Sequence, residues 1–60
     1  MNIKLGSQVK FLQPYQDELD LTFEVVEIEY ETDWALIMAN VPMIIQPTRV
    51  ANISELELIN

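Results

Sequence analysis

Residues 22–39, TFEVVEIEYETDWALIMA, decide the fold of this chain. Thr22–Tyr30 is a run of β-branched and aromatic residues that alternate with glutamates, and Trp34–Ala39 is a second, apolar run. The polar residues Glu31–Asp33 separate the two runs. Two strand-like runs joined by a short polar break predict a β-hairpin.

The alternation of apolar and acidic residues slips by one position inside the first run. Phe23 and Val25 share one parity, whereas Val26 and Ile28 share the other. If the strand holds one extra residue at this point, all of its apolar side chains point inward and its glutamates point outward. These glutamates are Glu24, Glu27 and Glu29. The sequence therefore predicts a bulged or bent strand, which can take part in two packed layers of sheet.

Shorter strands are expected on both sides of this hairpin. Gln8–Leu12 alternates as an opening strand, and Leu56–Ile59 alternates as a closing one. Met43–Gln46 is an apolar run bounded by prolines, which predicts a short fourth strand that Thr48–Ala51 continues beyond a kink. The result is an all-β fold of five strands in a single domain, residues 1–60.

Asn52 and Glu55 have the spacing of a capping box. In this motif the side chain of the first residue accepts from a backbone N–H in the first turn, and the glutamate side chain accepts from the backbone N–H of the first residue. Only one helical turn fits between Asn52 and the closing strand, so a one-turn 3-10 helix is expected there. The loop Gln13–Asp20 precedes the bent strand. Its apolar residues Tyr15 and Leu19 either tuck beneath the loop or remain available for contact.

The second apolar run has no charge on either face. Trp34, Leu36 and Met38 share one face, and the other face carries Ala35, Ile37 and Ala39. A strand that is apolar on both sides is covered on both sides or has one side at an interface. Trp34 is either a core residue or an exposed anchor.

The composition excludes most chemistry. The chain of 60 residues has no cysteine and no histidine, so it lacks thiolate metal ligands, disulfides and the commonest general base. A single glycine excludes a glycine-rich phosphate loop. Asp17, Glu18 and Asp20 lack the spacing of a calcium loop. We therefore expect no enzyme activity, no catalytic residue, no metal and no cofactor.

The charge is strongly asymmetric. Ten acids face three bases, giving a net charge of −7. Eight of the acids fall in the segment Asp17–Asp33, which contains no base. Such a segment repels nucleic-acid backbones and attracts basic proteins. The alternative is that these glutamates lie on the solvent-exposed face of a strand and serve solubility only.

Five short strands, a long first loop, a bent second strand and a 3-10 turn before the last strand resemble an SH3-like barrel. Residues 6–11, GSQVKF, look like the opening strand of KOW-type barrels, and residues 53–58, ISELEL, look like their 3-10 turn and closing strand. Asp17-Glu18-Leu19, Asp33-Trp34 and Pro47-Thr48 are similar to segments of eukaryotic SH3 domains. That resemblance implies a groove for proline-rich peptides with acids that grip an arginine.

The expected function is protein binding through a surface that joins the first loop to the end of the hairpin, with a basic partner or peptide. Its residues would be Tyr15, Asp17, Glu18, Glu31, Asp33, Trp34 and Pro47. One alternative is a homo-oligomer that pairs through the face of Ala35, Ile37 and Ala39 or through Met43–Ile45. Another is a nucleic-acid-associated module, similar to KOW or Tudor domains, that uses Lys4, Lys10 and Arg49.

No apolar run reaches the length of a membrane span, and the first residues lack the pattern of a signal peptide. A cytoplasmic protein without a membrane partner is the expectation.

Overall fold

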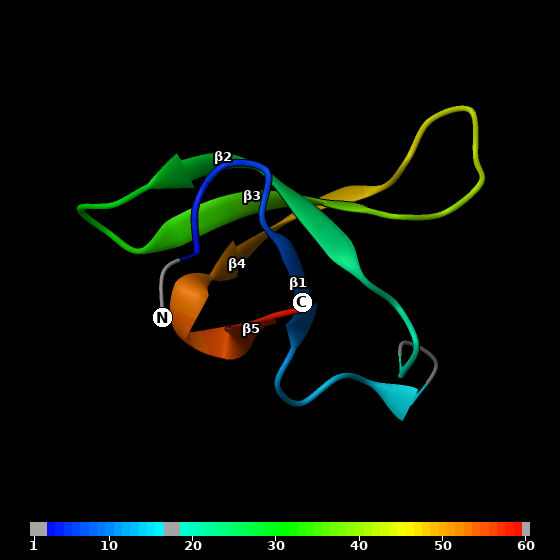
Figure 1. The fold of residues 1–60 in the computed structure, drawn as a ribbon, viewed down its shortest axis with the longest axis horizontal. Coiled ribbons are helices and arrows are strands. Elements are labelled where there is room, and N and C mark those ends of the chain that lie inside the picture. Colours follow the sequence, from blue (N-terminus) through cyan, green and yellow to red (C-terminus); the bar gives the residue numbers. More distant parts are fainter. Residues whose placement is uncertain (1–2, 17–18, 60) are drawn as a thin grey trace.

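A computed structural model of the chain describes residues 3–16 and 19–59. Its five antiparallel strands form one sheet in the order β4-β3-β2-β1-β5 (Figure 1). The strands are β1 (Gln8–Phe11), β2 (Phe23–Glu29), β3 (Trp34–Ala39), β4 (Thr48–Asn52) and β5 (Leu56–Leu58). Among the described residues β4 and β5 are the two edges, so the sheet is not closed. The all-β prediction with five strands is confirmed.

The predicted irregularity of β2 lies where the sequence places it. Val25 faces Ile37, and the next paired residue, Glu27, faces Leu36, so Val26 is an extra residue with no counterpart on β3. Phe23 and Val25 are buried before the bulge, and Ile28 packs against the core after it. The hairpin connection is one residue longer than predicted, because Tyr30 belongs to the turn and Glu29 pairs with Trp34.

The backbone of Val25 is also where β2 parts from β1. Its N–H donates to the carbonyl oxygen of Ser7 at 3.0 Å, and its carbonyl accepts from the N–H of Gly6 at 2.8 Å. Gly6 has a φ of +84°, a backbone angle that favours glycine, and so it allows the tight turn that leads into β1. Beyond Val25, β2 pairs with β3 alone in the described structure.

The core lies on the inner face of the curled sheet. Its buried side chains come from all five strands and from the segment before β1: Ile3, Val9, Phe23, Val25, Ala35, Ile37, Ala39, Ala51 and Leu56. The ring of Phe11 meets that of Phe23 edge-on, with centroids 5.4 Å apart. Because Ala35, Ile37 and Ala39 are part of this core, the hypothesis that they form an oligomer surface is wrong.

The turn between β4 and β5 is the predicted 3-10 turn, η2 (Ile53–Glu55). The Asn52 side-chain oxygen accepts from the Ser54 N–H at 3.0 Å, and the Glu55 carboxylate accepts from the Asn52 N–H at 3.0 Å. The capping box is thereby confirmed. The N–H of Leu12 donates to the Glu55 carbonyl at 2.9 Å, which ties the end of β1 to this turn.

The predicted strand Met43–Gln46 is wrong. These residues form bends within a loop that links β3 to β4, and β4 begins only at Thr48. The flanking prolines cannot donate to a ladder, and the pairing of Thr48 with Met38 leaves residues 40–47 outside the sheet. The three apolar side chains of Met43–Ile45 are consequently exposed.

The loop before β2 and the loop between β3 and β4 lie at the same end of the molecule (Figure 1). The Asn40 amide, at the start of the second of these loops, donates to Thr22 Oγ1 at the end of the first loop at 3.0 Å, and to Gln8 Oε1 at the start of β1 at 2.7 Å. Tyr15 and Leu19 are both exposed, so of the two alternatives for the first loop the structure has the one in which these side chains remain uncovered.

Two isoleucines offer a matched test of this core. Ile37 has no exposed surface, and Ile44 is fully exposed. Ile37→Ala should lower the free energy of unfolding by about 2–5 kcal/mol, since it leaves a cavity. A 60-residue chain has a total stability of about 3–9 kcal/mol, so this variant should be largely unfolded at moderate urea. Ile44→Ala should change urea stability by less than about 0.5 kcal/mol. Equal losses of stability for the two variants would contradict the burial of Ile37 and the exposure of Ile44.

Candidate functional site

The outer face of β3 is the apolar surface of interest. Trp34, Leu36 and Met38 alternate with the buried residues of this strand and face away from the core. On β4, Val50 lies directly opposite Leu36 and is 64% exposed. We call these four residues the outer-face strip. Trp34 itself is 45% exposed, so it is a surface residue and not a core residue.

A line of three acids borders this strip. Glu29 faces Trp34, Glu27 faces Leu36, and Glu24 faces Met38 across the β2–β3 pair. We call Glu24, Glu27 and Glu29 the glutamate row. Side chains directly opposite on one face of a sheet are about 4.5–5.5 Å apart at Cβ, so each carboxylate stands beside one apolar residue of the strip. The bulge at Val26 makes this match possible, because it returns Glu27 and Glu29 to the face of Glu24.

The surface is shallow. A hollow of about 250 Å³ lies over the ends of β2 and β3, and its lining includes Glu27, Glu29, Trp34, Leu36 and Val50. Glu29 Oε1 accepts from the Glu31 N–H at 3.2 Å, which holds this carboxylate at the start of the turn. A shallow apolar strip beside fixed negative charge suits an extended or convex partner more than an enclosed small molecule.

The structure gathers part of the predicted site. Glu31, Asp33 and Trp34 lie together at the β2–β3 turn, and all three are exposed. Asp33 has a φ of +62°, which aspartate tolerates better than most residues, and its carbonyl accepts from the Ile53 N–H at 2.7 Å. Asp33 therefore also has a structural role at this turn.

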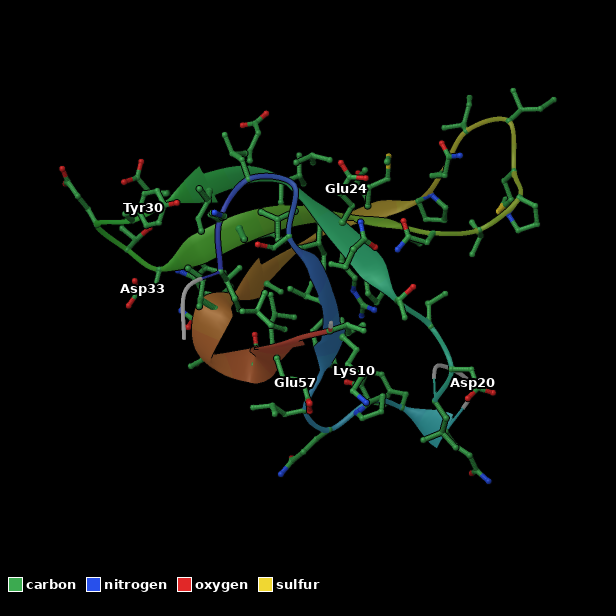
Figure 2. The ribbon with its side chains drawn as sticks, viewed as in Figure 1. Lys10, Asp20, Glu24, Tyr30, Asp33 and Glu57 are labelled. Carbon is green, nitrogen blue, oxygen red and sulfur yellow. The ribbon has the colours of Figure 1, made fainter. Side chains whose placement is uncertain are left out.

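The other predicted site residues lie elsewhere. Tyr15 is in the first loop, and Pro47 directly precedes β4. Figure 2 places Asp20, in the first loop, and Asp33, in the hairpin turn, at opposite ends of the molecule. Successive connections of an antiparallel meander leave the sheet at alternate ends, and the first loop does not fold back across β2. Asp17 and Glu18 lie outside the described residues.

The grouping implied by the resemblance to SH3 domains does not form as one groove. Trp34 pairs with Asn52, at the far end of β4 from Pro47. Pro47 and Asn52 are five residue steps apart along an extended strand, a span of about 17 Å. Trp34 and Pro47 thus cannot grip one short segment together.

The three bases do not form a single patch. Arg49 places its guanidinium carbon 4.9 Å from the centroid of the Phe11 ring, on the inner side of the sheet. Lys10 is exposed on the other face of β1, where it is paired in register with Glu57. Figure 2 shows Lys10 and Glu57 on the side of the molecule away from Glu24.

Sequence reasoning missed the outward direction of Leu36 and Met38, which are half-buried, and of Val50, which is exposed. Both faces of β3 are uncharged, so its own sequence does not reveal which face is exposed. The signal was in the partner strand: once the bulge turns the glutamates outward, the residues that face them across the hairpin must be outward as well.

Residues 3–16 and 19–59 include no helix with the length and hydropathy needed to cross a membrane. Within the same ranges, no three acidic side chains are grouped so that they could hold a metal ion. Comparison with known proteins found no matching family model, no matching curated protein and no matching solved structure.

Trp34 is the chain's only tryptophan, so its fluorescence reports on this surface directly. At low ionic strength, the ratio of the caesium to the iodide quenching constant should be at least about twofold higher for Trp34 than for free N-acetyltryptophanamide, because neighbouring carboxylates attract cations and repel anions. The difference should shrink as salt shortens the screening length from about 10 Å at 0.1 M to about 3 Å at 1 M. Glu29→Gln should reduce it. Inaccessibility of Trp34 to both ions would contradict the exposed position.

Proposed function

We propose that this protein is a non-enzymatic binding module whose outer-face strip docks an apolar segment of a basic protein partner. One observation carries the proposal: Trp34, Leu36 and Met38 are each paired in register with one member of the glutamate row. A partner strand or helix that alternates apolar and basic residues would match both features. Apolar side chains would cover the strip while lysines or arginines reach the carboxylates.

The two parts of the surface have different roles in this proposal. Trp34 is the anchor, since a large aromatic side chain at a contact supplies much of the binding energy. The glutamates lie at the rim, where each ion pair contributes about 0.2–1 kcal/mol. Rim charges mainly accelerate association and exclude acidic partners. A protein partner is favoured over nucleic acid because the same carboxylates repel phosphate groups.

We also infer a relationship in architecture to SH3-like barrels. The support is the strand order β4-β3-β2-β1-β5, the bulged second strand, and a 3-10 turn directly before the last strand. In this proposal the domain is an open version of that architecture, and it binds through the outer face of β3 instead of a groove between the first loop and the hairpin.

Two charge-matched variants test the proposed surface. Glu27→Gln/Glu29→Gln removes the two members of the glutamate row that face Leu36 and Trp34, and Asp20→Asn/Glu57→Gln removes the same number of charges elsewhere. The probe is a synthetic peptide of alternating lysine and leucine, titrated by calorimetry at low salt. Loss of two rim pairs at about 0.5 kcal/mol each should weaken binding about fivefold. The control variant should stay within about twofold of the unmodified protein.

A further pair of measurements guards against non-specific attraction. Trp34→Ala should weaken binding of the same peptide, and a glutamate–leucine peptide should not bind. Equal weakening by the two double variants would show that only net charge matters, and binding unaffected by Trp34→Ala would show that Trp34 is not the anchor. Either result would refute the proposed surface.

A further inference from the structure

The outer edge of β4 presents backbone groups that no described strand pairs with. Two hydrogen bonds fix its phase: Ala39 N–H donates to the Pro47 carbonyl at 2.9 Å, and Ile53 N–H donates to the Asp33 carbonyl at 2.7 Å. Because hydrogen-bonded and non-hydrogen-bonded pairs alternate in an antiparallel ladder, Arg49 and Ala51 direct their backbone groups toward β3. Thr48 and Val50 therefore direct theirs toward the free edge.

This edge lies in the part of the chain with the fewest charges. Residues 34–54 contain one charged side chain, Arg49, whereas residues 17–33 contain eight acids. The opposite edge, β5, has three residues with Glu57 at its centre. A short, charged edge strand resists pairing, and β4 lacks an acid that would do the same. The distribution of charge thus distinguishes the two edges.

An exposed apolar loop adjoins the same edge. Ile44 is 101% exposed and Ile45 is 81% exposed, and Met43 beside them is also largely uncovered. Consecutive large apolar side chains in such a position indicate an interaction surface. The residues between this loop and β3 carry no charge that would repel a second acidic chain.

We propose that two copies of this chain associate through antiparallel pairing of their β4 strands, with Val50 of each copy on the two-fold axis. In this register Val50 faces Val50 of the second copy as a hydrogen-bonded pair. Thr48 lies opposite Asn52, whose N–H remains bonded to the Glu55 carboxylate of its own chain. Centring the axis on Arg49 instead would set two guanidinium groups directly opposite each other, which is unfavourable. The Val50 register places each Arg49 opposite Ala51.

The arrangement keeps the acidic surfaces apart. It joins the two sheets so that the glutamate rows are separated by five strand spacings, or about 24 Å. That separation exceeds twice the screening length of about 10 Å at 0.1 M salt. The same register carries Gln46 and Pro47 alongside the second copy's η2, where Leu12, Ser54 and Glu55 help to line a hollow of about 340 Å³. The apolar loop would add its buried area there.

Two lysine variants with equal charge changes test this pairing. Val50→Lys sets two like charges face to face on the axis, and it should raise the dimer dissociation constant at least about tenfold. Thr32→Lys places the same charge in the hairpin turn, outside the residues that pair in the proposed dimer, and should leave the constant within about twofold. Both variants reduce the net negative charge, so general repulsion alone would make both associate more readily.

The measurement is sedimentation velocity over a wide range of protein concentration at about 0.15 M salt. The unmodified protein should shift from the 7.0 kDa of one chain toward twice that mass as concentration rises. Far-ultraviolet circular dichroism confirms that Val50→Lys remains folded, which its exposed position favours. Because no peptide is present, failure here leaves the proposed partner surface untouched.

Three results would overturn the pairing: a monomer at every concentration, a dimer that Val50→Lys does not weaken, or equal weakening by both lysine variants. A second experiment, with lipid vesicles, tests whether the exposed apolar loop binds a membrane surface instead of a second copy. If the protein stays monomeric but binds phosphatidylcholine vesicles, and Ile44→Ser abolishes that binding, the loop serves a lipid surface and the proposal is refuted.

Discussion

The single extra residue in β2 is the constraint on which the other features depend. Val26 has no counterpart on β3, and the pairing shifts by one position at that point. Without the shift, residues 27–29 would present their alternate faces, which would bury two glutamates and expose Ile28. The position is reinforced from the other side, because Val25 pairs through both of its backbone groups with the turn at Gly6 and Ser7. The bulge thus lies where β2 stops pairing with β1 and continues to pair only with β3. It determines which face of β2 carries the acids.

Charge segregation follows from that geometry and explains how so small a domain can combine an acidic surface with exposed apolar residues. The glutamate row borders the outer-face strip, while β4 and the loop before it carry a single charge, on Arg49. The Arg49 guanidinium stacks over Phe11 on the inner side, away from the strip. One half of the sheet therefore provides electrostatic attraction, and the other half provides apolar area and an available strand edge. The two proposed contacts are centred on different elements, the face of β3 for a basic partner and the backbone edge of β4 for a second copy, and they share Val50.

The sequence predicts this fold well wherever a local rule applies. The parity slip locates the bulge, the spacing of Asn52 and Glu55 locates the 3-10 turn, and Trp34–Ala39 matches β3 at both ends. Prediction from sequence fails where the pairing between strands determines whether a segment belongs to the sheet. Met43–Gln46 has strand-like residues, but the alignment of Thr48 with Met38 excludes it from the sheet. The candidate site shows the same division. The sequence predicts the outward direction of the glutamates, but it leaves Trp34 as either a core or a surface residue. The assembly of these residues with Leu36, Met38 and Val50 depends on the register between strands. The distance of Tyr15 and Pro47 from Trp34 depends on the end of the sheet at which each loop leaves it.

The most direct test of the bulge is a proton–proton distance measurement across β2 and β3 in solution. Ala35 directs its backbone groups toward β4, so its Hα approaches the Hα of the residue that faces it on β2. With the bulge that residue is Ile28. A strong nuclear Overhauser effect between the Hα protons of Ile28 and Ala35 is the predicted result. A strong effect between the Hα protons of Glu27 and Ala35 instead would mean regular pairing without the extra residue, and it would contradict the placement of the glutamates on which the proposed binding surface depends.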